Sequence, residues 1–489
     1  MTPEGLILGA IAVPLGGAAL IAAAHRMPDL REGVTLVAAA ALFLLVASLA
    51  PDVLAGGRPG VHVAEVMPGI ALAFRVEPLG MLFALVASGL WIVNSLYSIG
   101  YMRGNNEQHQ TRYYVCFAAA LASTMGIAFA GNLFTLFLFY EALTLVTYPL
   151  VTHHGTEEAR RAGRLYLALL VGSSIVFLLI AIVWTWQVAG TIDFVRGGIL
   201  SGKVSNTTMG ILLALYVFGI GKAAVMPVHR WLPAAMVAPV PVSALLHAVA
   251  VVKAGAFAVV KVVVYVFGVE TISGMTSVDW LPFVAGFTII AASIVALRSD
   301  NLKRRLAYST VSQLSYIVLA AALLTPLSII GAALHIATHA LGKITLFFAA
   351  GAIYTAAHKT EVSQLAGIGR RMPWTMGAFA IGSLSMIGLP PAAGFVSKWY
   401  ILSGAMATGQ WGAVAVLVAG TLLSAGYLLP IVYRAFFLSP AASHGHHEEH
   451  GEAPLTMVIA VSVSALGTVA LFFFPEALLA LSRQLAGVG

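Results

Sequence analysis

Long apolar stretches separated by short polar segments run through the whole chain. A helix needs about 20 apolar residues to cross the hydrocarbon core of a bilayer, and about fourteen stretches reach that length. The longest polar stretch, about residues 439–453, leaves no room for a separate soluble domain. The pattern predicts an all-α integral membrane protein with helices over residues 5–24, 33–50, 76–99, 113–130, 132–151, 165–188, 208–226, 241–267, 280–297, 306–324, 327–355, 374–402, 411–437 and 455–482.

The composition supports the membrane class. Hydrophobic residues make up 60% of the chain and charged residues 9%, whereas soluble domains carry about 25% charged residues. The net charge of +7 does not require a nucleic-acid partner, because basic loops set the orientation of membrane proteins. The single cysteine, Cys116, excludes an internal disulfide and an iron–sulfur cluster held by this chain alone, so we expect it to pack.

The basic residues alternate with the expected loops. When the loops are numbered from the N-terminus, odd loops receive 16 Lys and Arg and even loops receive 4. The positive-inside rule then places odd loops in the cytoplasm and both termini outside. We therefore expect a multi-pass protein of the plasma (inner) membrane, in contact with the lipid bilayer. The first apolar stretch lacks a basic segment before it, which favours a retained helix over a cleaved signal peptide.

Several ionisable residues lie inside apolar stretches, where a lysine costs about 3 kcal/mol by insertion scales. Glu141 and Lys222 fall at similar depth in the stretches 132–151 and 208–226. One interpretation is an ion pair that only pins two helices, but apolar packing would join them at far lower cost. The other is a functional pair. The lysines inside apolar stretches are Lys222, Lys253, Lys261, Lys343 and Lys398.

Two of these lysines accompany prolines that interrupt a helix. Pro227 follows Lys222, and Pro390 and Pro391 precede Lys398. Paired interruptions at membrane depth indicate a transport site between inverted repeats. The two lysines are 176 residues apart, in helices expected to run in opposite directions. The same offset carries Glu141 to Ile317, so the second half lacks the acidic partner.

The stretch 241–267 carries His247 and Lys253, which are six residues apart. This spacing corresponds to about 120° around a helix, so we expect the two side chains to face different neighbours. Lys261 lies near the outer end of the same stretch. We expect it to snorkel to the interface and leave it out of the site.

His335, His339 and Lys343 step by four residues, which aligns them on one helical face. Histidine exchanges protons near neutral pH, so the face suits a proton relay. A zinc site is the alternative interpretation, but no acidic or cysteine residue lies on this face to complete the ligands. The run from His444 to His450 is typical of a solvated loop, with weak metal binding as the alternative. We predict no metal site and no cofactor.

Three segments together resemble a known family. They are NLFTLFLFYEALTL, GKAAVMPVHRWLPAAMVAPVPVSALLHAVAVVKAG and GLPPAAGFVSKW. They are similar to the proton-conducting antiporter-like membrane subunits of respiratory complex I, membrane-bound hydrogenases and Mrp-type cation/proton antiporters. The resemblance covers essentially the whole chain.

The resemblance implies fourteen core helices with two inverted five-helix repeats, helices 4–8 and 9–13, and broken helices 7 and 12. The corresponding divisions are 1–112, 113–268, 269–438 and 439–489. It also implies a relay that starts at Glu141 and Lys222 and continues inward. The residues that match the family positions are Glu141, Lys222, His247, Lys253, His339, Lys343 and Lys398; His335 joins them by its spacing.

The branch of the family follows from fewer residues. Lys398 and the short length resemble the D-type subunit of Mrp antiporters, whereas LLHAVAVVKAG resembles complex I equally well. The sequence thus predicts a proton-translocating subunit of a multisubunit monovalent cation/proton antiporter, with other membrane subunits as partners and Na⁺ or K⁺ as the exchanged ion. The alternatives are a proton-pumping subunit of NADH-quinone oxidoreductase or hydrogenase, and a self-sufficient transporter. The chain holds no redox centre, and whether it belongs to an enzyme stays open.

Overall fold

A computed structural model describes residues 2–439 and 451–488, and the His444–His450 run lies outside them. The described chain is mostly helical, and ten of its helices are long and apolar enough to cross a membrane. The expected class, a multi-span all-α membrane protein, is confirmed. The main helices are α1 Pro3–Ala23, α2 Pro28–Leu54, α3 Pro78–Gly104, α4 Gln110–Ala128, α5 Leu133–Val151, α6 Glu157–Ser173, α7 Ile180–Ala189, α8 Asn206–Gly219, α10 Val240–Ala244, α11 Val251–Val262, α13 Trp280–Arg298, α14 Leu302–Ala322, α15 Pro326–Ala357, α16 Pro373–Ile387, α17 Gly394–Ala407, α18 Trp411–Phe437, α19 Leu455–Phe473 and α20 Glu476–Ala486.

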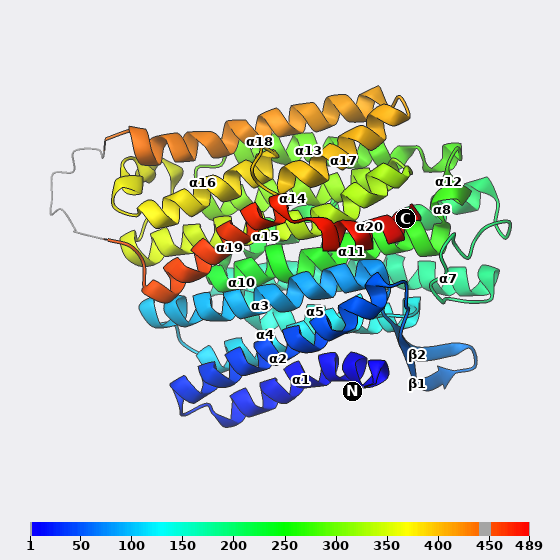
Figure 1. Cartoon of the computed structure of the whole chain (residues 1–489), viewed down its shortest axis with the longest axis horizontal. Helices are drawn as coiled ribbons and strands as arrows, with labels where there is room; N and C mark the ends of the chain where they lie inside the picture. The colour runs from blue at the N-terminus through cyan, green and yellow to red at the C-terminus, as the bar shows by residue number, and fades with distance from the viewer. Residues whose placement is uncertain (1, 440–450, 489) are drawn as a thin grey trace.

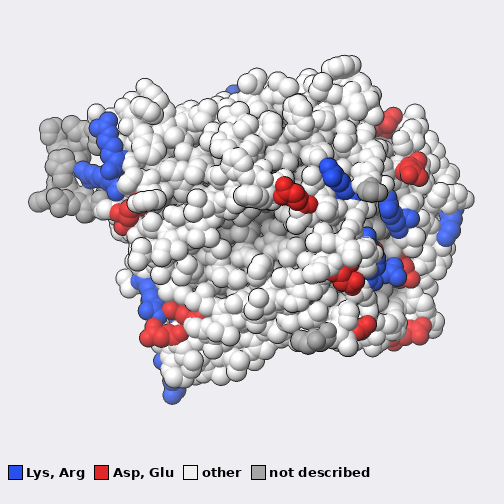
Figure 2. All heavy atoms as spheres, in the orientation of Figure 1, with Lys and Arg blue, Asp and Glu red and all other residues white. Residues whose placement is uncertain are grey.

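The long helices lie side by side in one bundle (Figure 1). Two segments form its centre: the most apolar window of Val240–Phe267 is 100% buried and that of Pro326–Ala357 is 94% buried, against 33% for α1 and α2. Helix α15 packs against α3, α14, α16, α17 and α19. Charged side chains gather toward the two ends of the molecule, and most of its flank is uncharged (Figure 2). Such a flank suits lipid, because acyl chains offer no partner to a charge.

Both expected helix interruptions are present. Helix α8 ends at Gly219, and Lys222 lies in the 3₁₀ turn Gly221–Ala223 that follows. The break therefore comes before Lys222, whereas the sequence placed it afterwards, at Pro227. The stretch 374–402 is divided into α16 and α17, and Lys398 lies in the first turns of α17. Each lysine thus lies next to backbone that has left the helical ladder.

A β-hairpin was not expected from the hydropathy pattern. Strands β1 (Gly60–Met67) and β2 (Ile70–Arg75) pair antiparallel between α2 and α3, and the hairpin projects from one end of the bundle (Figure 1). Its second strand is tied to the turn between α4 and α5, where Arg75 N–H donates to the Phe129 carbonyl at 2.7 Å. The second strand thereby connects the hairpin to α5, and the first strand is mostly exposed.

Candidate functional site

Lys222 is fully buried between the α8 break and α5. Its ammonium donates to the Tyr140 carbonyl at 2.8 Å and to the Thr144 hydroxyl at 2.6 Å. It also lies 3.2 Å from the centre of the Tyr140 ring, a cation–π contact that replaces part of the lost hydration. In the described chain no ion pair joins Lys222 to Glu141, and one carboxylate oxygen of Glu141 is buried without a hydrogen-bond partner.

Helix α11, which carries the next lysine, packs against the Lys222 segment. Gly255 allows this approach, because a Cβ there would lie 2.2 Å from Ala223 N and from the Lys222 carbonyl carbon. Two residues earlier in α11, the Lys253 ammonium contacts Nδ1 of His339 on α15. This contact joins the residue ranges assigned to the two repeats and places a titratable nitrogen on each side.

His247 lies one segment earlier, in the π-helical turn Leu245–Val249. Its ring packs on Phe347 with centroids 4.8 Å apart, and both of its ring nitrogens are buried without a partner. His247 and Lys253 contact different residues, as expected, but both of these residues, Phe347 and His339, lie on α15. The π-helical turn widens the helix between them, so the 100° per residue of a regular helix no longer applies.

The face His335–His339–Lys343 forms as the four-residue spacing predicts. The rings of His335 and His339 stack with centroids 6.0 Å apart. His335 Nδ1 lies 2.8 Å from the Ser397 hydroxyl, and His335 Nε2 lies 3.1 Å from the Gln313 side-chain oxygen. Lys343 donates to the Ser309 hydroxyl at 2.8 Å. A zinc ion on His335 and His339 would have to displace these polar partners, so the arrangement suits a hydrogen-bonded relay better.

Lys398 ends the row beside the α16–α17 break. Its ammonium donates to the carbonyls of Met386 at 2.7 Å and Ile387 at 3.0 Å, which the end of α16 leaves free. It lies 4.5 Å from the Tyr316 ring centre. Ser397, the preceding residue, bonds His335, so the row from Lys253 to Lys398 has a polar group at each step.

Lys261 contradicts its expected position. Its side chain is 0% exposed, so it does not snorkel outward from the protein. The ammonium lies 3.2 Å from Glu77 and donates to the Ala130 carbonyl at 2.8 Å. It also lies over the Phe194 ring at 4.4 Å. The acidic partner was missed because Glu77 precedes α3 and is far from Lys261 in sequence.

Other polar partners were also missed. Hydroxyl and amide side chains recur at three- or four-residue spacing beside the titratable groups, a signal the sequence carries on apolar helices. Each lies on a helix face turned toward the row. They are Tyr140 and Thr144 on α5, Ser309, Gln313 and Tyr316 on α14, and Ser397 on α17.

The fold and the site together define a multi-span membrane protein with a buried row of ionisable groups between two interrupted helices. The family profile described as NADH:quinone oxidoreductase/Mrp antiporter, TM, matches residues 130–424. The chain belongs to this family.

Relatives from two kinds of complex are similar over nearly the whole chain. NADH-quinone oxidoreductase subunit N of Desulforudis audaxviator is 33% identical over 462 residues, 91% of either chain. The D-type subunit of the Na(+)/H(+) antiporter of Alkalihalophilus pseudofirmus is 25% identical over 489 residues, 99% of this chain and 97% of its own. A chain of the Mrp complex from Dietzia sp. DQ12-45-1b superposes with a TM-score of 0.85 at 24% identity, covering 100% of this chain and 97% of that one, which establishes a shared fold.

Proposed function

We propose that the chain is a proton-translocating membrane subunit of a multisubunit monovalent cation/proton antiporter. The observation that carries the proposal is the Lys253–His339 contact, which joins titratable groups on α11 and α15 at the centre of the bundle. Lysine and histidine can both take up and release a proton, whereas a purely structural contact would need neither. The proposed order of groups is Glu141, Lys222, Lys253, His339, Lys343 and Lys398, with His247 and His335 as further members beside this path.

The topology completes this proposal. Fourteen crossings would place the basic odd loops in the cytoplasm and both termini outside the plasma membrane. Residues 113–268 and 269–438 would form two inverted repeats, each with one interrupted helix that carries a lysine. The exchanged ion would be Na⁺ or K⁺, bound with the help of other subunits of the complex.

A second function is supported by a separate observation. The relative that is 33% identical is a subunit of an NADH-quinone oxidoreductase, whereas the antiporter relative is 25% identical. In that case the same row of groups would move protons, and partner subunits would supply the driving reaction from NADH oxidation. The two functions share this chain's role and differ in what drives it.

One reconstitution separates them. The intact complex is purified from its native membrane by a tag on this chain and placed in vesicles that contain a pH-sensitive dye. The antiporter proposal predicts that an imposed Na⁺ or K⁺ gradient moves protons without NADH. Proton movement that needs NADH and a quinone, and that ignores both cations, would support the oxidoreductase function instead.

A further inference from the structure

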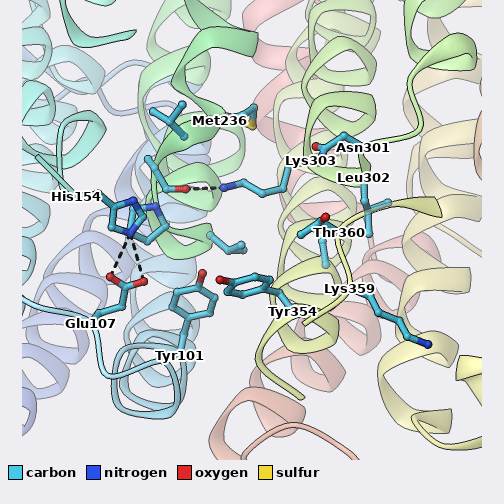
Figure 3. A pocket seen from close by; sticks show the side chains of 15 residues that line it. Tyr101, Glu107, His154, Met236, Asn301, Leu302, Lys303, Tyr354, Lys359 and Thr360 are labelled. Atoms are coloured by element: carbon cyan, nitrogen blue, oxygen red, sulfur yellow. Dashed lines mark hydrogen bonds and ion pairs between the residues drawn. The ribbon is translucent and has the colours of Figure 1, made fainter. Parts of the chain in front are cut away.

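A cavity of about 290 Å³ opens at one end of the bundle, where segments from five loops converge. Figure 3 shows Glu107 and His154 on one side and Lys303 and Thr360 on the other. All five segments lie in or next to the odd loops, which carry the excess of basic residues. We call this cavity the mouth; its lining includes Glu107, His154, Met236, Val240, Lys303 and Ala350.

A carboxylate–imidazole cluster forms one wall of the mouth. The Glu107 carboxylate lies 3.3 Å from Nε2 of His154 and 3.6 Å from Nε2 of His153. The side chain of His154 is 40% exposed, whereas that of His153 is 2% exposed and has no hydrogen-bond partner on either ring nitrogen. The contact with Glu107 raises the pKa of His154, and burial lowers the pKa of His153 to about 4. The exposed His154 ring can therefore take up a proton, whereas the buried His153 ring beside it stays neutral.

The other charged and titratable groups at the mouth oppose or frame this cluster. Lys303 reaches across the cavity and donates to the Ala238 carbonyl at 2.5 Å (Figure 3). Arg112 donates to the His153 carbonyl at 2.8 Å. Tyr101, Tyr354 and Lys359 are the other titratable residues of the lining. Burial lowers the pKa of Lys303 to about 8, so below that pH a metal cation would meet its positive charge. Glu107 supplies the local negative charge that draws protons to the opposite wall.

Two of the segments that line the mouth continue along the chain to the buried row. Val240 begins α10, and the π-helical turn that follows α10 carries His247. Ala350, on the opposite side, lies one turn from Phe347, the residue on which the His247 ring packs. His247 offers two unpartnered buried nitrogens at that point. A buried imidazole without a partner is costly unless water or a transferred proton reaches it.

A single face of α15 continues from the mouth through the row. Positions 350, 347, 343, 339 and 335 are spaced by three or four residues, which places them along one face. Ala350 lines the mouth, Phe347 supports His247, and the remaining three are the relay residues Lys343, His339 and His335. One helix therefore connects the mouth to both the His247 end and the Lys398 end of the row.

We infer that the mouth is where protons pass from the water into the relay, with Glu107 and His154 as the collecting pair and His247 as the first internal acceptor. The inference rests on the proposed proton-translocating function and adds its point of uptake. It gives a positioning role and a transfer role to two loop residues that are not members of the relay. Glu107 positions the His154 ring, and His154 exchanges the proton with water.

Blocking the mouth tests its place in the route. In a Cys116→Ser background, Met236→Cys places a thiol in the mouth, and Gln108→Cys places one on an exposed loop position outside its lining. A bulky membrane-impermeant thiol reagent is then added to either face of the reconstituted complex. We expect labelling of Met236→Cys, from the basic-loop face only, to abolish proton transport, and labelling of Gln108→Cys to leave it unchanged.

The outcomes separate the inference from the function on which it rests. Undiminished transport after complete labelling of Met236→Cys would overturn the inference while leaving the translocation function in place. A wild-type complex that moves no protons under any driving force would overturn both. The thiol variants are compared before and after labelling, so a folding defect would already show in the unlabelled sample.

The collecting pair is tested by the pH profile of transport. Glu107→Gln and His154→Gln should slow proton uptake about tenfold at alkaline pH. Charged clefts raise association rates by at least about this factor. The loss should shrink in acid, where free protons are plentiful, and Glu107→Asp should restore part of the rate. His25→Gln, an exposed histidine of the first odd loop, serves as the control. An equal loss at every pH would indicate a structural role and overturn the assignment of the pair.

Discussion

Lys222 shows how a single charge is held inside an apolar bundle. A backbone carbonyl and a hydroxyl of α5 bind its ammonium, and Glu141 on the same helix makes no direct contact with it. The sequence placed Glu141 and Lys222 at similar depth but could not show which oxygens face the ammonium. That depends on the local unwinding after Gly219, where the lysine leaves the helical spacing. An effect of Glu141 on Lys222 would therefore act without a direct contact between the two side chains.

Glu141 is therefore expected to modulate Lys222 by changing its own charge or position. Glu141→Gln should stop proton transport, because a neutral amide cannot modulate the lysine. Glu141→Asp should retain part of the activity, since the charge remains on a shorter arm. Transport is measured in vesicles with the assembled complex. If Glu141→Gln combined with Lys222→Met transports at the wild-type rate, the pair is structural only.

At the scale of elements, apolar length predicts where helices lie but not where they bend. The stretch 241–267 became a helix that contains two π-helical turns, Leu245–Val249 and Val263–Phe267. The first of these turns contains His247 and precedes Lys253, so a regular helical wheel does not give the angle between the two side chains. The hairpin Gly60–Arg75 was missed because its alternating pattern lies between two much stronger apolar stretches. Prolines marked both interruptions. The break near Lys222 comes before the lysine and not after it, at Pro227.

The contact between α11 and the Lys222 segment depends on the absence of a side chain at Gly255. Gly255→Ala would place a methyl group 2.2 Å from the Lys222 backbone, so one element must move. Overpacking of this kind costs about 1–3 kcal/mol. We expect a lower unfolding temperature in detergent and weaker proton transport.

Gly172→Ala on α6 is the matched control for Gly255→Ala. A Cβ at Gly172 meets nothing within 4 Å, and alanine favours a helix by about 0.5–1 kcal/mol over glycine. Its unfolding temperature should stay level or rise. Equal thermal stability and transport of the Gly255→Ala and wild-type complexes would show that the close approach is unimportant.

At the scale of the whole molecule, the sequence indicates the class and the buried charges but not how they meet. The five lysines inside apolar stretches and the histidine face stood out because charge is rare there. The Lys253–His339 contact, the Glu77–Lys261 pair and the mouth each join residues far apart in the chain. Such contacts depend on how helices pack, which a periodic pattern along one helix does not contain.

The central claim is that one proton route passes through both halves of the bundle and crosses between them at Lys253 and His339. The most direct test measures proton transport by the reconstituted complex with Lys253→Met, with His339→Gln and with the control His25→Gln. A group that transfers protons contributes about 10²-fold or more to a rate. The account predicts a loss of at least that size for each buried variant, an unchanged rate for the control, and intact assembly for all three. Wild-type transport by either Lys253→Met or His339→Gln would contradict it.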